Sequence, residues 1–418
     1  MVRWQLDGFE DLVRFHHDDS PEEIAFSPDG KLLATGSTGD VQVWETATGR
    51  RLYGLDTEEF EGKGFFSPDG KLLAQFGYSF DHKPIPIWVY EASTGKLVSR
   101  ISDTEVRNFS GFRADSRGVL TTGRDNLRKV WDPFTGKLLD TIPGPALPAH
   151  LKEGERVFSP NGKWFCGVGE DEILRVWEVS TGKEVFQLGR AWEVFQTELL
   201  GKPIKRRIKN YDQIIFSPTG QYLVAIKGHT MEKDYTVSST VIAWEVASGR
   251  QVASVDDPQD QAYIFAVKPT FDPSGKILAV VTRDNLVHLM DLATGRELAR
   301  LKHDVKDVTD LTFSSDGHWL AAATRDHIAR VWELPSGREV ARLEHPNQVM
   351  RVAFSPDGSR LATACLDKQV RLWYWRTADL VAAACRRLPR NLSREEWREY
   401  LGDEPYRPTC SNLPAPEK

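Results

Sequence analysis

The stretch VMRVAFSPDGSRLATACLDKQVRLW at residues 349–373 holds three strands and the two turns between them. Apolar and polar residues alternate in its first six positions, as expected of a strand that is half buried. Pro356, Asp357 and Gly358 then supply the backbone geometry of a tight turn. RLATAC at 360–365 forms the next strand, and a hairpin at 366–369 leads into VRLW at 370–373. The stretch therefore predicts three consecutive strands joined by short turns.

This pattern recurs along almost the whole chain. Each copy has a phrase like FSPDG, an apolar run, a strand that ends in Trp (Met290 in the sixth copy) and, in seven copies, a Thr-Gly or Ser-Gly turn. The seventh copy continues into a fourth strand, REVARL at 338–343. A period of about 40–45 residues with four strands per repeat is typical of β-propeller blades, so the sequence predicts an all-β propeller. The eight phrases lie at 26–30, 66–70, 112–116, 158–162, 216–220, 271–275, 313–317 and 354–358.

The number of blades follows from the turns. The Thr-Gly or Ser-Gly turn before the fourth strand occurs only seven times, because nothing like it follows Trp373. LVRFHH at 12–17 stands before the first phrase as REVARLEH stands before the last, so we expect it to complete the eighth blade. Such closure removes an open sheet edge. The sequence thus predicts an eight-bladed propeller over residues 1–376, with a seven-bladed ring as the alternative.

The repeats resemble the tryptophan–aspartate (WD-repeat) propeller family over about residues 12–373. The resemblance implies a hydrogen-bonded tetrad of His, Ser or Thr, Asp and Trp in each blade, in which the carboxylate bonds to the imidazole and to turn amides. These residues resemble catalytic pairs, but the resemblance implies a structural role, since a buried polar network must be satisfied. The last blade matches with His345, Thr363, Asp367 and Trp373, and the seventh matches with His303, Asp326 and Trp332.

Composition narrows the class of function. The net charge of −6 argues against a general nucleic-acid or membrane-surface binder, which usually has a positive excess. No apolar run is long enough to span a membrane, and the N-terminus has no signal-peptide pattern. The four cysteines lack metal or disulfide spacing, so we expect small buried side chains and a reducing cytoplasm.

One face of the ring is the predicted contact surface. All long insertions fall in the links between blades and in the hairpins after the second strands, whereas the other face keeps its short turns. A rigid scaffold with elaborated loops on one face is typical of binding proteins. Arginines before the hairpin Asp would form a positive ring suited to an acidic or carboxylate-rich protein or peptide, unless they are solvated and pair with the neighbouring Asp. The predicted partner-binding residues are Arg124, Glu170, Arg283 and Arg325, together with Lys205, Arg206 and Arg207 in the basic 202–209 loop.

Residues 377–418 leave the repeat. Two helices are predicted, at 378–388 and after the capping box formed by Ser393 and Glu396, and their apolar faces should dock on the propeller or on a missing domain. The string LSREEWREYLGDEPYRPTC resembles the ending of many bacterial WD-repeat proteins. That resemblance implies a bacterial origin and an effector domain upstream in a larger protein.

The sequence therefore favours a non-catalytic scaffold for proteins or peptides, and the tail resemblance implies the C-terminal sensor domain of a bacterial signalling or defence protein. Binding of nucleic acid or another phosphate ligand through the basic 202–209 loop is the first alternative. A propeller-based hydrolase or lyase is the second, but the chain has no Gly-rich phosphate loop, no His-Glu-x-x-His and no Gly-x-Ser-x-Gly. No cofactor or metal is expected, although HHDD at 16–19 has the residue types of a metal cluster.

Overall fold

A turn built on one serine hydroxyl explains why the phrase FSPDG recurs. In the last blade the Ser355 hydroxyl donates to the Asp357 carboxylate at 2.5 Å and accepts from the Arg360 amide at 2.9 Å. Gly358 has φ +66°, a conformation that glycine adopts without strain. The turn thus fixes the step from the first strand to the second in the six blades that carry this serine. Equivalent serine-to-amide bonds are made by Ser27, Ser67, Ser159, Ser217 and Ser314.

The computed structural model describes most of the chain. The described residues are 13–17, 19–61, 63–76, 86–102, 106–123, 128–142, 157–169, 171–190, 192–199, 202–209, 211–230, 237–257, 268–282, 286–302, 308–387, 390–402, 405–410 and 413–414.

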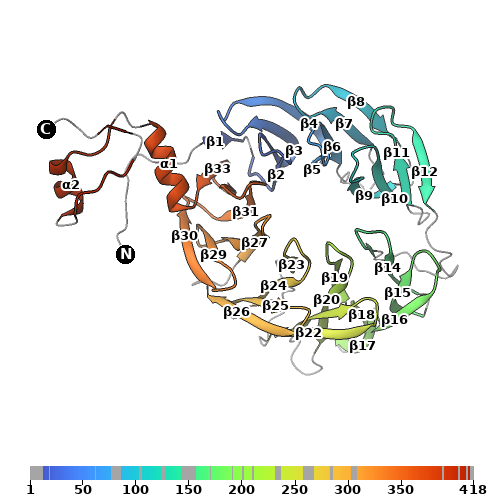
Figure 1. Cartoon of the computed structure of the whole chain (residues 1–418). Coiled ribbons are helices and arrows are strands. Elements are labelled where there is room, and N and C mark those ends of the chain that lie inside the picture. Colours follow the sequence, from blue (N-terminus) through green and yellow to red (C-terminus); the bar gives the residue numbers. More distant parts are fainter. Residues whose placement is uncertain are drawn as a thin grey trace.

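Eight antiparallel sheets follow one another around a ring (Figure 1). In blade 1, the two halves of one long strand pair with different neighbours; the strands are β2 (Glu23–Phe26), β3 (Leu32–Glu45) and β4 (Arg51–Glu61). Blade 2 has β5 (Lys63–Phe66), β6 (Leu72–Phe76), β7 (Ile87–Glu91) and β8 (Leu97–Ile101). Blade 3 has β9 (Val106–Phe112), β10 (Val119–Gly123), β11 (Arg128–Trp131) and β12 (Leu138–Ile142). Blade 4 has β13 (Val157–Phe158), β14 (Trp164–Val168), β15 (Ile173–Glu178) and β16 (Glu184–Arg190).

The second half of the ring continues the same order. Blade 5 has β19 (Tyr211–Phe216), β20 (Tyr222–Thr230), β21 (Val237–Glu245) and β22 (Arg250–Asp257). Blade 6 has β23 (Thr270–Phe271), β24 (Ile277–Thr282), β25 (Leu286–Asp291) and β26 (Arg296–Lys302). Blade 7 has β27 (Val308–Phe313), β28 (Trp319–Thr324), β29 (Ile328–Glu333) and β30 (Arg338–Glu344). Blade 8 has β31 (Val349–Phe354), β32 (Arg360–Cys365), β33 (Gln369–Tyr374) and β1 (Val13–His16).

Blade 8 is closed by the N-terminal strand, which confirms the predicted eight blades and the predicted closure. Strand β1 pairs with β33 from Val13↔Leu372 to His16↔Gln369. Phe15 is fully buried and lies 5.0 Å from the Trp44 ring of blade 1. The ring of His17 bonds to the Thr35 hydroxyl of blade 1 at 2.9 Å. The N-terminal segment therefore holds blade 8 and blade 1 together.

The core lies between neighbouring blades. Apolar residues from the facing sheets of blades 6 and 7 form one cluster, which contains Leu289, Phe313 and Trp332. Similar clusters lie between blades 1 and 2, 2 and 3, 4 and 5, 5 and 6, 7 and 8, and 8 and 1. Because every blade buries both of its faces, the strands read as apolar on both sides. This close packing makes the ring a rigid support for the loops and hairpins on its two faces.

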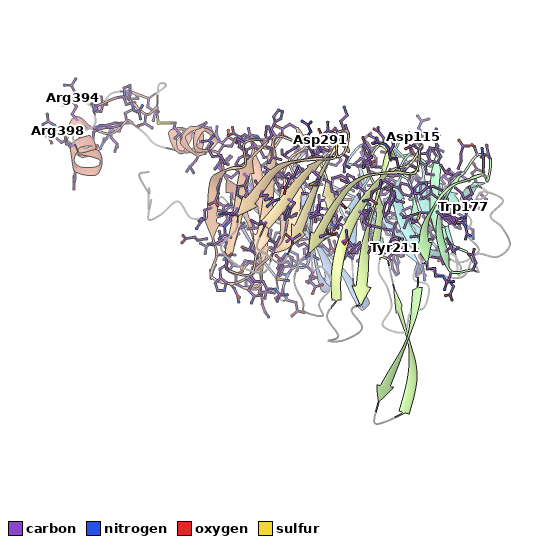
Figure 2. The ribbon with its side chains drawn as sticks, turned by 90° about the horizontal axis from the view of Figure 1, so that it is seen from below. Asp115, Trp177, Tyr211, Asp291, Arg394 and Arg398 are labelled. Atoms are coloured by element: carbon purple, nitrogen blue, oxygen red, sulfur yellow. A yellow bond between two sulfur atoms is a disulfide. The ribbon has the colours of Figure 1, made fainter. Side chains whose placement is uncertain are left out.

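The two faces of the ring differ. Asp115 and Asp291 mark one face, which holds the FSPDG-type and Thr-Gly turns and is here called the turn face (Figure 2). The hairpin of β17 (Trp192–Leu199) and β18 (Lys202–Lys209) projects from the opposite face, here called the hairpin face. The expectation of a basic loop at 202–209 is wrong in this respect, since these residues form a strand that pairs with β17 over its whole length. In these two segments polar residues alternate with Val, Phe, Thr and Ile, and only two residues connect them. Both features are typical of a two-stranded β-ribbon.

The C-terminal tail contains α1 (Thr377–Arg387) and α2 (Arg394–Leu401). The chain leaves blade 8 through Trp375, whose indole N–H donates to the Gly358 carbonyl at 3.2 Å, and α1 contacts β33. Figures 1 and 2 both show α2 apart from the ring, so docking of this helix on the propeller or on a missing domain stays a prediction. No helix among the described residues has the length and apolar character needed to cross a membrane.

The tail has a small core of its own, which explains the position of α2. Trp397 is buried and lies 5.5 Å from the Tyr406 ring. Asn391 donates to the Cys410 carbonyl at 2.9 Å and accepts from the Cys410 amide at 2.8 Å. Cys385 and Cys410 form a disulfide, so the prediction of unpaired cysteines is wrong for these two; their separation of 25 residues has no recognisable motif spacing. Cys166 and Cys365 are free and buried, as the sequence predicts.

Charged residues occupy equivalent positions on the innermost strands of four consecutive blades. Asp310, Arg351, Glu23 and Lys63 alternate in sign from blade 7 through blade 8 to blade 2. Lys63 pairs with Glu23 at 2.5 Å, and the Asp310 carboxylate accepts the Val352 amide N–H at 3.0 Å. Burial raises the pKa of Asp310 to about 6, because the Val352 amide and Arg351 compensate only part of the lost hydration. Asp310 therefore links blades 7 and 8, but its ionised form lowers the free energy of unfolding.

Replacement of Asp310 by Asn is expected to stabilise the protein near neutral pH by about 1–3 kcal/mol. The pKa in the folded state, about 6, exceeds the ordinary value of 3.8, so the folded state binds the proton more tightly. Asp310 therefore contributes most to the free energy of unfolding at pH values below its pKa in the unfolded chain. This contribution is lost as the pH rises through its pKa in the folded protein. Denaturant unfolding of Asp310→Asn and the parent at about pH 4 and pH 7.5 measures this difference. An equal gap at both pH values would contradict the assignment.

Candidate functional site

Ion pairs inside the hairpins of blades 4, 7 and 8 shape the hairpin face. In blade 8 the Asp367 carboxylate accepts the Gln369 amide N–H at 3.2 Å and both terminal nitrogens of Arg371, one of them at 3.0 Å. Arg371 is almost fully buried. Burial alone would raise the pKa of Asp367, but the hydrogen bonds from Arg371 outweigh it and hold the pKa below its ordinary value. The hairpin is therefore fixed by an internal, neutralised charge pair.

The same pair recurs in two other blades. In blade 7, Arg330 donates to Asp326 at 2.6 Å and to the Thr324 hydroxyl at 3.0 Å, and in blade 4, Arg175 donates to Asp171 at 2.7 Å. The sequence analysis missed these arginines. Their signal was available, because a basic residue stands four positions after the hairpin aspartate in each of the three blades.

The other three tetrad residues form a hydrogen-bonded chain. In blade 8 the Thr363 hydroxyl accepts the Trp373 indole N–H at 2.9 Å and bonds to the His345 ring at 2.8 Å. The second ring nitrogen of His345 lies 3.0 Å from the Leu343 carbonyl. Both ring nitrogens are thus engaged outside the hairpin, and the carboxylate that was expected on the imidazole is held by Arg371. The structure corrects that expectation, because a guanidinium offers a carboxylate two parallel donors.

Blade 1 contains a chain that the sequence analysis did not assign. Thr35 accepts the Trp44 indole N–H at 2.8 Å and bonds to His17, which follows β1 as His345 follows β30. Blade 7 has the buried Trp332 but Ala322 in place of the hydroxyl, and its predicted His303 lies outside the described residues. In blades 1 and 8 the tryptophan, threonine and histidine bond to one another within the fold, which is consistent with a structural role.

The predicted partner-binding residues are only partly described. Arg325 lies in the β28–β29 hairpin and is exposed, beside Asp326, which pairs with Arg330. Its charge is therefore available on the hairpin face. Arg124, Glu170 and Arg283 lie outside the described residues, so the positive ring around the opening stays a prediction.

The basic residues of β18 lie on the projecting hairpin. Their backbone positions pair with β17 as Lys205↔Gln196, Arg206↔Phe195 and Arg207↔Val194. The β20–β21 insertion is also a ribbon, paired as far as Thr230↔Val237. Two of the predicted irregular insertions are therefore regular β-ribbons, which position their residues better than open loops do.

The part of the chain that the structure describes shows no metal centre. Among the described residues, no group of three His, Cys, Asp or Glu side chains is placed to hold a metal ion. The Asp–Arg pairs neutralise each other, and the histidine rings bond to threonine. In blade 6 the His288 ring bonds to the Thr282 hydroxyl at 2.9 Å and to the Glu297 carboxylate at 2.6 Å. Thr282 and His288 are both buried, so this hydroxyl–imidazole–carboxylate chain is packed inside the blade, which is consistent with a structural role.

Comparison with known proteins agrees with this architecture. The family model described as "WD domain, G-beta repeat" matches residues 10–45, 147–178, 295–333 and 337–374. The chain is 18% identical to a crystal structure of Chaetomium thermophilum Sqt1 bound to the N-terminus of the ribosomal protein L10, with a TM-score of 0.61. That match covers 87% of this chain and 99% of the Sqt1 chain, and it shows the shared fold.

Curated relatives match part of the chain. Transducin beta-like protein 3 of Bos taurus is 28% identical over 193 residues, 43% of this chain and 23% of that protein. Serine-threonine kinase receptor-associated protein of Gallus gallus is 24% identical over 168 residues, 40% of this chain and 45% of that protein. The chain thus spans less than half the length of these two relatives. Both are eukaryotic, so the bacterial subtype inferred from the tail stays a prediction.

Proposed function

We propose that this chain, an eight-bladed propeller that carries WD repeats, is a non-catalytic scaffold that binds proteins or peptides through its hairpin face. The observation that carries the proposal is the projecting β17–β18 hairpin, an extension of one face of a rigid ring (Figure 2). A binding element on a rigid support loses little conformational entropy on association. The relatives support the proposal, since Sqt1 has been crystallised with a ribosomal-protein segment and the Gallus gallus protein is named for its association with a receptor.

The proposed partner is acidic. Arg325 is exposed on the hairpin face, and β18 carries Lys205, Arg206 and Arg207 on an otherwise acidic molecule. Arginine binds carboxylates with two parallel hydrogen bonds. Arg124, Glu170 and Arg283 are proposed to surround the same opening.

The experiment selects displayed random peptides of about 12 residues on the immobilised protein and measures the affinity of the enriched peptides. We expect acidic peptides that bind Arg325→Glu or a variant lacking residues 191–210 more than tenfold less tightly, a loss above about 1.4 kcal/mol. Lys276→Glu, at an exposed position on the turn face, is the matched charge control. Acidic peptides that bind the parent and both variants equally well would contradict the assignment to this face.

Nucleic acid is the second candidate ligand, because β18 concentrates Lys202, Lys205, Arg206, Arg207 and Lys209 in one strand. A phosphate-binding surface of this kind shows affinity that falls steeply between roughly 50 and 200 mM salt. Titration of a fluorescent single-stranded oligonucleotide at several salt concentrations, with and without residues 191–210, tests this candidate.

The finer assignments rest on the tail. We propose residues 1–376 as the propeller, 377–418 as a tail with its own core, and cytoplasmic localisation. The free thiols of Cys166 and Cys365 support this localisation, whereas the Cys385–Cys410 disulfide argues for an oxidising compartment. The tail's resemblance to bacterial WD-repeat endings supports a sensor role behind an upstream effector domain in a bacterial signalling or defence protein. Expression from the full reading frame of the source gene would test whether such a domain exists.

A further inference from the structure

A disulfide joins two parts of the C-terminal tail that differ in their relation to the ring. Cys385 lies on α1, and Cys410 lies beyond α2 near the end of the chain. Both cysteines are buried, at 8% and 2% exposure. The Cys385 Sγ also lies 3.9 Å from the Thr409 carbonyl oxygen. The disulfide therefore ties the end of the tail to its first helix.

Only the first helix is anchored on the propeller. Arg376, just before α1, donates to the Gly358 carbonyl at 2.9 Å, and α1 contacts β33. The segment after α1 lies apart from the ring and is here called the distal tail (Figures 1 and 2). Its described residues are 390–402, 405–410 and 413–414. The disulfide thus connects an anchored helix to a unit that projects from the molecule.

The distal tail is too small to fold on apolar burial alone. Among its described residues, only Asn391, Trp397 and Cys410 are buried. Its hydrogen bonds are local, for example from the Tyr406 hydroxyl to the Leu392 carbonyl at 3.0 Å. Chains shorter than about 40 residues usually need a cross-link, a metal or a partner to fold. The fold of the distal tail therefore depends on the disulfide.

The ring itself does not depend on oxidation. Cys166 in blade 4 and Cys365 in blade 8 are free thiols and fully buried. In a reducing compartment, the disulfides that do form are usually transient and serve redox sensing. A tail bond that opens and closes is compatible with thiols and a disulfide in one molecule.

We propose that Cys385 and Cys410 form a reversible redox switch, which folds the distal tail when they are oxidised and unfolds it when they are reduced. The oxidised protein presents α2, with Arg394 and Arg398 directed outward, on a folded support (Figure 2). The reduced protein carries the same residues on an unfolded extension of α1. The switch acts on the tail alone and does not rest on the proposed binding at the hairpin face.

The chemistry is thiol–disulfide exchange with a low-molecular-weight disulfide such as oxidised glutathione. The thiolate of one cysteine attacks a sulfur of that disulfide, so a mixed disulfide forms and one thiolate leaves. The thiolate of the other cysteine then attacks the protein sulfur of the mixed disulfide, which closes the Cys385–Cys410 bond and releases the second thiolate. The two protons that the cysteines lose go to the two released thiolates. Two electrons pass to the oxidant, and reduced glutathione reverses both steps.

Limited trypsin digestion of the full chain measures the state of the distal tail. Arg390, Arg394 and Arg398 are exposed cleavage sites within it. The protein is first equilibrated in glutathione buffers that range from oxidising to the cytosolic poise, and alkylation with mass spectrometry gives the oxidised fraction. We expect cleavage at these sites to be more than tenfold faster in the reduced protein, because loss of the cross-link favours local unfolding.

Two variants identify the cysteines responsible. Cys385→Ser with Cys410→Ser should be cleaved at the reduced rate in every buffer. Cys166→Ala removes a thiol from the ring and is the matched control, so its distal tail should respond to the buffers as the parent does. Melting curves establish that the ring of each variant folds like the parent. Because the reduced parent provides the same comparison without a substitution, the test does not depend on the double variant.

Two outcomes would overturn the switch. Equal cleavage rates in the oxidised and reduced parent would show that the fold of the distal tail does not depend on the disulfide. A disulfide that stays closed at the cytosolic glutathione poise would identify a permanent structural bond. Neither outcome involves peptide binding, so the proposed function of the hairpin face is tested separately.

Discussion

A chain that lacks residues 1–17 is expected to aggregate or to melt far below the parent. The deletion removes β1, so β33 becomes an exposed sheet edge with unpaired backbone groups. It also empties the buried site of Phe15, a loss of about 3–5 kcal/mol by itself. Such a loss is comparable with the total stability of many folded domains, about 5–15 kcal/mol. Differential scanning calorimetry and size-exclusion chromatography measure both effects.

The point variants Phe15→Ala and Phe15→Leu separate packing from strand pairing. Phe15→Ala should lose most of the packing term, and Phe15→Leu should lose less because it fills more of the site. A deletion variant that is monomeric and melts with the parent would show that β1 does not close the ring.

Replacement of Asp326 by Ala is expected to destabilise the protein by about 3 kcal/mol. The Arg330 side chain is only 1% exposed and would lose the carboxylate at 2.6 Å that neutralises it. Glu339, 3.9 Å from the Arg330 Nε, retains part of the compensation, which places the loss near the lower end of the range for broken buried pairs. Urea unfolding monitored by tryptophan fluorescence measures the change.

A double-mutant cycle with Arg330→Met tests the cause. Met keeps much of the side-chain volume without the charge, so adding it to Asp326→Ala should recover part of the lost stability. Burial raises the pKa of Asp326, but bonds from Arg330 and Thr324 outweigh it and lower the pKa below 3.8. The stabilisation is therefore present above about pH 4 and is lost as the pH falls through the folded pKa. Additive effects of the two changes would argue against a direct interaction.

The ring could be predicted because its signals are local and repeated. The absence of a Thr-Gly turn after Trp373, together with LVRFHH at 12–17, was enough to predict the closing strand that pairs with β33. The phrase FSPDG recurs because each of its polar or glycine residues stabilises the turn. In the last copy the Ser355 hydroxyl bonds to the Asp357 carboxylate and to a backbone amide, and Gly358 adopts a positive φ.

The partners of the polar side chains could not be predicted from the same pattern. The sequence places both His345 and Arg371 near Asp367, so either side chain could be its partner. Only the structure shows that strand β33 positions Arg371 to donate two hydrogen bonds to the Asp367 carboxylate. The disulfide between Cys385 and Cys410 depends on how the tail folds back through Asn391, which no spacing rule encodes. The β17–β18 ribbon could not be predicted from the repeat, because the link between two blades has no fixed length or pattern.

On the turn face, Leu97 of blade 2 and Phe134 of blade 3 line the same groove. Alignment of the repeats with one another shows Leu97 and Phe134 as departures without any knowledge of the structure. Only the structure shows that these departures from two different blades meet in one place.

The pairing of β1 with β33 also sets the order of events during synthesis. Val13 and its partner Leu372 lie roughly 360 residues apart, and ribosomes add about 5–20 residues per second, so the first strand made waits on the order of 20–70 s for its partner. Seven blades can form in sequence during that time, each with neighbours already present. The edge of β1 that pairs with β33 stays unpaired throughout, so the nascent chain carries an open sheet edge until blade 8 is complete.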